Sequence, residues 1–157
     1  MKRSAELRGL SEDHHHGLVH ARRLRRAASG EGSGQAQAAR SFLEFWRAET
    51  SGHFRKEEEV LLPVYAKHGG DLGREPVREM HVQHARLRGL VMRLSDEVRA
   101  GAARPETVRE IGERLEEHIR LEERELFPML EESLPVEALE EVGARLAATE
   151  ADPRAER

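Results

Sequence analysis

Apolar residues recur at steps of three and four along most of this chain, and that spacing is typical of amphipathic α-helices. The segment from Val77 to Val98 is an example, since it carries Met80, Leu87 and Leu94 at these steps. No stretch shows the strict alternation of apolar and polar residues that indicates a half-buried strand. The pattern therefore predicts an all-α protein.

Glycine and proline divide this pattern into five helices. The segment 30–34 reads Gly-Glu-Gly-Ser-Gly and should be a loop, and His-Gly-Gly at 68–70 is a stop signal. Pro76 and Pro105 stand where helices begin, a position that suits proline. The predicted helices run from about 4 to 28, 35 to 67, 75 to 101 and 105 to 132, and from after Pro135 to about 149.

Two prolines, Pro63 and Pro128, lie inside the second and fourth predicted helices. Proline has no backbone N–H and its ring clashes with the preceding turn, so we expect each to kink or break its helix.

Four long helices joined by short loops predict an antiparallel up-down four-helix bundle with a short extra C-terminal helix. In that arrangement the second and fourth helices run in the same direction and face each other diagonally across the centre. A chain of 157 residues is large enough for one hydrophobic core. We therefore expect one domain over 1–150 and a frayed polar tail over 151–157.

Composition narrows the class of protein. Charged residues make up 36% of the chain, and the formal net charge of -4 does not favour nucleic-acid binding. The absence of cysteine excludes disulfides, thiolate zinc sites and iron–sulfur clusters. There is no apolar N-terminal signal segment and no apolar run long enough for a membrane span. We expect a soluble, cytoplasmic protein that contacts neither membrane nor nucleic acid.

An eleven-residue segment occurs twice. Residues 53–63 read HFRKEEEVLLP and residues 118–128 read HIRLEERELFP. Each copy places a histidine four residues before a glutamate, so the imidazole and the carboxylate share one helix face. Such pairs are ligands that transition metals take from adjacent turns. The repeat therefore suggests a site for two metals, built on His53 with Glu57 and on His118 with Glu122.

Histidine also interrupts the apolar stripes of the first and third predicted helices, at His14 and His84. A lone histidine on such a stripe is usually an ordinary core residue. Four inward histidines with two glutamates would cost several kcal/mol each if they were left unpaired, and metal cations compensate them directly. His81, close to His84, and Glu49, one turn before His53, are possible further ligands or orienting partners.

At these residues the chain resembles the hemerythrin-like, or HHE cation-binding, family. The matching elements are LSEDHHHGLVHARRL, HFRKEEEVLLP, MHVQHARLRGL and HIRLEERELFP, in the order of the family and over about Leu10 to Leu130. The resemblance implies an up-down four-helix bundle with a non-haem di-iron centre, two Fe2+/Fe3+ ions joined by an oxo or hydroxo group and by both glutamates. The ligands it implies are His14, His53, Glu57, His84, His118 and Glu122.

Two departures from the oxygen-carrying members matter. The third helix has His81 and His84 at a spacing of three rather than four, and the last carboxylate is Glu122 or Glu123 in place of an aspartate five residues after its histidine. We prefer Glu122, because it repeats the geometry of His53 and Glu57. Four histidines, two bridging glutamates and a bridging oxo or hydroxo group would fill about ten of the roughly twelve coordination positions on two six-coordinate metals, so roughly two would stay open.

Three functional classes follow. A di-iron protein could bind or react with O2, NO or peroxide, or it could be a catalase-like or peroxide-reducing enzyme. A structural or adaptor bundle, held together by a metal such as zinc, is the third. The expected partners are a small diatomic ligand or peroxide, together with a possible homodimer or redox partner.

Overall fold

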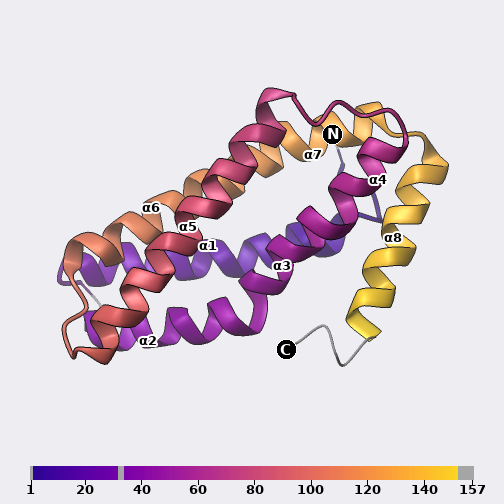
Figure 1. Cartoon of the computed structure of the whole chain (residues 1–157). Helices are drawn as coiled ribbons and strands as arrows, with labels where there is room; N and C mark the ends of the chain where they lie inside the picture. Colours follow the sequence, from indigo (N-terminus) through magenta and orange to yellow (C-terminus); the bar gives the residue numbers. More distant parts are fainter. Residues whose placement is uncertain (1, 32–33, 152–157) are drawn as a thin grey trace.

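The computed structural model describes residues 2–31 and 34–151, and within them the chain is helical and contains no strand (Figure 1). The first helix is α1 (Arg8–Ala28). The second stretch contains α2 (Gln35–Phe45), α3 (Ser51–Lys56) and α4 (Leu62–Lys67), joined by the π-helical turns η1 (Trp46–Thr50) and η2 (Glu57–Leu61). Then follow α5 (Glu75–Arg99), α6 (Pro105–Leu121), the π-helical turn η3 (Glu122–Leu126), α7 (Phe127–Ser133) and α8 (Val136–Ala151).

The predicted all-α class is confirmed, and one boundary differs. The first helix begins at Arg8 instead of about Ser4. Arg3 and Ser4 are held against α7 instead, because the Arg3 guanidinium and the Ser4 backbone N–H both donate to the Glu131 carboxylate, at 2.8 and 2.7 Å. The predicted polar tail lies outside the described residues from position 152 onward, as do positions 32 and 33 of the predicted glycine-rich loop.

Neither internal proline breaks its helix. Pro63 and Pro128 each stand two residues after a π-helical turn, η2 and η3, and the chain stays helical from 35 to 67 and from 105 to 133. A π turn makes its backbone hydrogen bonds one residue further along, which widens the helix locally. The wider turn relieves the clash that proline makes with a regular preceding turn. Sequence periodicity did not reveal these turns.

Helices α1, α2, α5 and α6 form a bundle in which each contacts at least two of the others, and we call these contacts a closed set. Helix α1 packs against α6, α6 against α5, α5 against α2, and α2 against α1 (Figure 1). Helix α8 lies outside this set and covers α4 and η2. Within the described residues no helix is both long enough and apolar enough to cross a membrane.

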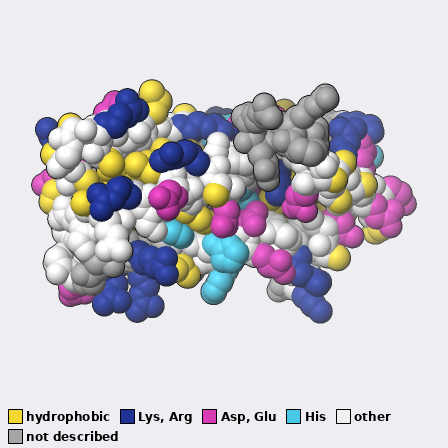
Figure 2. All heavy atoms as spheres, turned by 90° about the horizontal axis from the view of Figure 1, so that it is seen from below, with side chains coloured by type: hydrophobic (Ala, Val, Ile, Leu, Met, Phe, Trp, Pro, Cys, Tyr) yellow, Lys and Arg dark blue, Asp and Glu magenta, His cyan; other side chains and the backbone are white. Residues whose placement is uncertain are grey.

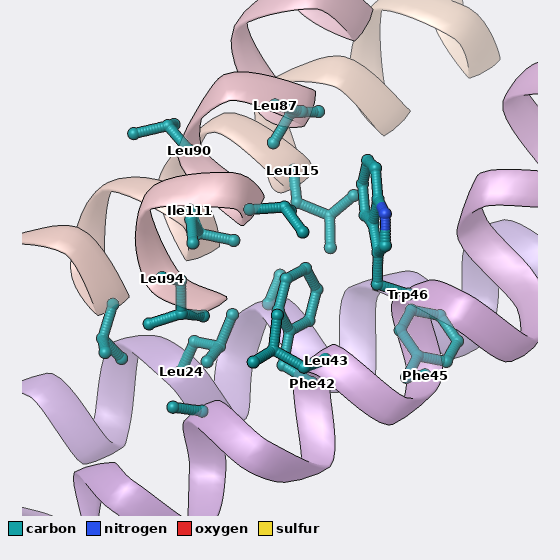
Figure 3. Close-up of a cluster of buried hydrophobic side chains, with 14 of the residues drawn as sticks. Leu24, Phe42, Leu43, Phe45, Trp46, Leu87, Leu90, Leu94, Ile111 and Leu115 are labelled. Carbon is teal, nitrogen blue, oxygen red and sulfur yellow. The ribbon is translucent and has the colours of Figure 1, made fainter. Parts of the chain in front are cut away.

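Buried apolar side chains gather in two clusters. The α2 cluster joins α1, α2, α5 and α6, and Figure 3 shows Leu24, Phe42, Leu94 and Ile111 meeting there from these four helices. The α8 cluster lies beyond it and includes residues from α4, α7 and α8, such as Tyr65, Leu130 and Val142; its other members include Leu10, Val60, Met80 and Leu126. In the helical stretches 8–28, 35–67, 75–99 and 105–133, buried polar residues lie between the part that belongs to the α2 cluster and the part that belongs to the α8 cluster.

Helices α1 and α6 approach closely at two glycines. A methyl group on Gly112 would lie 2.8 Å from the backbone oxygen of Ala21, and one on Gly17 would lie 2.8 Å from the Ile119 side chain. The first contact is with rigid backbone, whereas the second is with a side-chain tip. Both glycines therefore allow α1 and α6 to pack at short range beside the polar residues described next.

Candidate metal centre

Six buried polar residues occupy the space between the α2 and α8 clusters, and we call them the polar layer. The four histidines come from four different helices, and the two glutamates stand at the first positions of η2 and η3. Exposure is 0% for both glutamates and at most 5% for the histidines. The polar layer consists of His14 of α1, His53 of α3, Glu57 of η2, His84 of α5, His118 of α6 and Glu122 of η3.

These residues form two groups within the described part of the chain. In each group, ligand-type atoms from all four members lie within 4.8 Å of one another. Both glutamates belong to both groups, so their carboxylates lie between the two sets of histidines. One group contains His14, His53, Glu57 and Glu122, and the other contains Glu57, His84, His118 and Glu122.

Each histidine turns its Nε2 atom toward the glutamates. The distance from Nε2 to a carboxylate oxygen is 2.9 Å for His14 with Glu122 and for His53 with Glu57. It is 3.3 Å for His84 with Glu57 and for His118 with Glu122. Four imidazole nitrogens thus converge on two carboxylates.

The Nδ1 atoms of the same histidines face outward, and each has its own acceptor. His14 Nδ1 lies 2.6 Å from Glu123 and His84 Nδ1 lies 2.7 Å from Glu58. The other two outward distances are 3.0 Å from His53 to Asp13 and 3.2 Å from His118 to the side-chain oxygen of Gln83. A proton held at Nδ1 by such an acceptor leaves the Nε2 lone pair free for a metal.

The two halves of the polar layer repeat the same construction. Asp13, which precedes His14, accepts from His53 of a neighbouring helix. In the same way Gln83, which precedes His84, accepts from His118. Glu58, which follows Glu57, orients His84, and Glu123, which follows Glu122, orients His14. The orienting residues are thus sequence neighbours of the buried ones.

Aromatic and arginine side chains complete each half. The His84 ring stacks on Phe54 at 3.6 Å, and Arg88 lies over the same Phe54 ring while it pairs with Glu58. On the other side, the His14 ring stacks on Phe127 at 5.3 Å, and Arg3 lies over Phe127 while it pairs with Glu123. These layers of side chains hold the imidazoles in place and limit the access of water.

The inner atoms lack ordinary partners. All four oxygens of Glu57 and Glu122 are buried without a hydrogen bond in the described structure, as are the Nε2 atoms of His84 and His118. Burial of such atoms costs about 1–3 kcal/mol each, and more when they are charged. Cations placed between the carboxylates and imidazoles would satisfy all of them, so the donor set fits a pair of metal ions.

The pKa shifts show how strongly these groups depend on one another. Burial opposes the charged form of His53, but the charge of Glu57 and the hydrogen bond to Asp13 raise its pKa to about 10. Burial prevails at His118, whose pKa falls to about 4. Burial also opposes ionisation of Glu122, yet His118 and His14 hold its pKa well below the ordinary value. The carboxylate is therefore ionised at neutral pH, as a metal ligand must be.

A family comparison agrees with this geometry. A family model described as the hemerythrin HHE cation binding domain matches residues 7–130. The chain belongs to the hemerythrin HHE cation-binding family. The resemblance seen in the sequence is thereby confirmed. Neither the curated proteins nor the solved structures contained a match to this chain.

Within this hemerythrin-like domain, the other candidate residues lie outside the two groups. His81 is exposed on α5. Glu49 is also exposed, and it contacts His16 Nδ1 at 3.1 Å, whereas Asp13 takes the position of orienting partner to His53. Glu123 lies on the outer side of His14, so the structure places Glu122 between the histidines.

Three orienting residues, Asp13, Glu58 and Gln83, were not predicted from the sequence. Their signal is weak, because acidic and amide residues are common on exposed helix faces. One signal in the sequence could nevertheless have indicated an orienting residue, because the pair Glu-Glu occurs in both copies of the repeated segment, at 57–58 and 122–123. A second glutamate retained in both copies points to a role distinct from that of the first.

A small cavity adjoins the polar layer. Its volume is about 20 Å3, which is enough for roughly one molecule the size of water. Three histidines of the layer, His14, His53 and His118, reach its wall. Apolar groups make up much of the rest, and Asp13, Glu49 and Thr50 also line it; the apolar members are Gly17, Phe45, Phe54, Leu115 and Ile119.

Proposed function

We propose that this protein holds two iron ions at the polar layer and binds or reacts with O2, NO or peroxide there. The observation that carries the proposal is the set of buried carboxylate oxygens and imidazole nitrogens that lack hydrogen-bond partners, arranged in two groups with both glutamates in common. We further propose that the helices have the antiparallel up-down order of a four-helix bundle. The short loops and the closed set of helix contacts support that order.

The donor types favour iron over zinc. Four imidazoles and two carboxylates are too many for one tetrahedral zinc ion. They suit two ions of higher coordination number with mixed nitrogen and oxygen ligands. His14 and His53 would hold one ion, His84 and His118 the other, and Glu57 and Glu122 would contact both. When bound, such a pair supplies a reversible one-electron change at each metal and open positions for a small ligand.

The residues of the chain prepare the site for that chemistry. Asp13, Glu58, Gln83 and Glu123 keep the histidine protons at Nδ1, so every Nε2 is available inward. The stacked aromatic rings exclude bulk water. The adjoining cavity admits only a very small molecule, which favours a diatomic gas or peroxide over an organic substrate.

The decisive experiment is metal analysis with an optical spectrum of aerobically purified protein. We expect two irons per chain and the absorption of a bridged diferric pair. Glu122→Gln should lose both ions, because Glu122 belongs to both groups. His81→Ala, which changes an exposed histidine of the same helix as His84, should keep both. A single zinc per chain would instead support a metal-stabilised structural bundle.

A second experiment on the same iron-loaded protein distinguishes a binding protein from an enzyme. Hydrogen peroxide added to the iron-loaded protein should evolve O2 rapidly if the centre is catalase-like, and His118→Ala should abolish that activity. An inert iron-loaded protein whose reduced form binds O2 or NO would place it in the binding class.

A further inference from the structure

One face of α5 exposes apolar side chains that belong to neither buried cluster. Hydrophobic side chains reach the surface at several places on the molecule, some of them beside Lys and Arg (Figure 2). Among the described residues, Met92 at 70% and Val82 at 60% are two of the three most exposed large apolar side chains. Both belong to α5, and Ala85 and Gly89 between them are also exposed. This face of α5 is therefore open to a contact that the single chain does not make.

These four residues are the middle of a longer, regularly spaced row along α5. From the first residue of the helix to the last, exposed residues recur at alternating steps of three and four. That repeat is the spacing at which one helix packs along another in a coiled coil. We call the row the α5 seam, and it consists of Glu75, Arg78, Val82, Ala85, Gly89, Met92, Asp96 and Arg99.

The centre of the α5 seam is complementary to a second copy of itself in the antiparallel direction. With Leu87 as the midpoint, Val82 of each copy lies opposite Met92 of the other. Ala85 of each copy then lies opposite Gly89 of the other. The two large apolar side chains thus cover each other, and the small residues at the midpoint allow the helices to approach closely. Such a pairing is isologous, the arrangement of a twofold dimer.

The charged ends of the α5 seam match in the same register. Arg78 of one copy lies opposite Asp96 of the other, and Glu75 lies opposite Arg99. Within one chain, Asp96 and Arg99 are 3.5 Å apart and about three-quarters exposed. Arg78 and Glu75 have no side-chain partner among the described contacts of the chain. Each charge of the seam therefore meets the opposite charge in the second copy, which fixes both direction and register.

The charges beside the centre of the seam do not oppose this pairing. Arg86 and Arg88 flank the midpoint, where two copies bring arginines near each other. Each arginine is already paired within its own chain, Arg86 with Glu110 at 2.9 Å and Arg88 with Glu58 at 2.8 Å. Their positive charges are therefore compensated before the two copies meet.

A surface groove borders the C-terminal half of the seam and adds apolar surface there. Its volume is about 260 Å3. In the antiparallel register this half faces the N-terminal half of the second copy, whose large apolar side chain is Val82. The groove is lined by Leu43, Trp46, Arg47, Val91 and Ser95, together with Met92, Asp96 and Arg99 of the seam.

We propose that the α5 seam is the interface of a homodimer, in which α5 of one chain packs against α5 of the other in the antiparallel direction. The possible homodimer expected from the sequence thereby gains a definite surface. A single pair of helices is small beside the roughly 1,600 Å2 of a standard interface, so the dimer dissociates on dilution. His84 points from the buried side of the same helix, and the interface requires no metal at the polar layer.

Reversal of one charge tests the interface. Sedimentation over a range from micromolar to millimolar protein measures the dissociation constant. Arg78→Glu and Asp96→Arg should each weaken the dimer at least tenfold, because like charges then face each other at both symmetric positions. Arg22→Glu is the control, since Arg22 is an exposed arginine of α1, and it should associate as the wild type does.

A mixture of the two charge variants tests the pairing itself. In a mixed dimer the glutamate introduced at position 78 faces the arginine introduced at position 96, and the unchanged Arg78 faces the unchanged Asp96. The equal mixture should therefore associate about as tightly as the wild type, whereas each variant alone stays weak. A mixture no tighter than the single variants would overturn the pairing.

Engineered cysteines test the direction of the helices. The chain has no cysteine of its own, so Val82→Cys and Met92→Cys each introduce one thiol. In the antiparallel register these two positions face each other, while identical positions of two copies lie about 15 Å apart along the helix axis. With an added mild oxidant, a mixture of the two variants should form a disulfide-linked dimer, and each variant alone should form little. Linkage confined to identical chains would overturn the antiparallel order.

The outcome is independent of the proposed function. Metal content and circular dichroism of every variant should equal those of the wild type, because the changed side chains are exposed. A protein without iron that still dimerises through the seam would contradict the proposed function alone. A wild type that stays monomeric at every concentration would overturn the dimer and leave this face of α5 for a different partner.

Discussion

At the scale of single residues, each imidazole is held by two partners of different kinds. The buried glutamates face Nε2, and a second set of acceptors faces Nδ1. Partners of the second kind fix the tautomer and the ring orientation of a metal ligand and raise its basicity. The spacing of His53 and Glu57 is visible in the sequence, whereas Asp13 reaches His53 from another helix and is found only in the folded chain.

Glu123→Gln should weaken metal binding by about tenfold or more, because it removes the charged acceptor of the His14 Nδ1 proton. The measurement is competition with a chelator of known affinity. Glu125→Gln, an exposed change in the same turn, should have no effect. Arg3→Ala removes the ion pair to Glu123 but keeps the His14 contact, so it should retain most of the affinity. Equal affinities for Glu123→Gln and wild type would contradict the orienting role.

At the scale of elements, the π turns place the glutamates. Glu57 and Glu122 are the first residues of η2 and η3, and each turn is followed by a proline. Insertion of one residue into a helix changes the direction of every later side chain by about 100° relative to the preceding turn. The glutamates and the apolar residues after them can then both face the interior. Helix α8 covers η2 from outside and so encloses the turn that carries Glu57.

The close packing of α1 on α6 can be tested at Gly112. Gly112→Ala should destabilise the protein by about 1–3 kcal/mol, because the new methyl group would meet the Ala21 backbone oxygen at 2.8 Å. Gly89→Ala is the matched change in α5, where nothing lies within 4 Å. It should stabilise by about 0.5–1 kcal/mol through helix propensity alone. Urea unfolding measures both, and a stabilising Gly112→Ala would show that the helices can separate there.

At the scale of the whole molecule, a charged layer divides the hydrophobic interior. The α2 cluster and the α8 cluster supply the apolar burial, and the polar layer lies between them with most of its inner atoms unpartnered. Buried charged groups of this kind oppose folding unless they are compensated. Bound cations would therefore contribute to stability as well as to chemistry.

Removal of metal should lower the temperature of unfolding. At a free metal concentration of about one hundred times Kd, binding stabilises the folded chain by about 2.7 kcal/mol. For a protein of this size that free energy corresponds to roughly 5–10 °C, measured by calorimetry with and without a chelator. Glu122→Gln should show no dependence on the chelator. A chelator-insensitive wild type would argue against metal at the polar layer.

Much of the site was predictable because its residues are repeated or conspicuous. His53 with Glu57 and His118 with Glu122 stand at helical spacing in two similar segments, and His14 and His84 interrupt apolar stripes. The structure brings these six together. His81 also lies near such a stripe, but it is exposed, since a shift of three residues along a helix turns a side chain by about 60° from the original direction.

The all-helical class, the approximate positions of the helices and the residue types available for a metal could all be inferred from the sequence. These depend on local periodicity and on side-chain chemistry, which any single segment displays. Three features became visible in the folded chain alone: the acceptor that faces each Nδ1, the widened turns before Pro63 and Pro128, and the sides of His14 on which Glu122 and Glu123 lie. The partners of each Nδ1 and the positions of Glu122 and Glu123 depend on contacts between segments that are far apart in the chain, whereas the widened turns change the helix type without changing the apolar spacing from which helices were predicted.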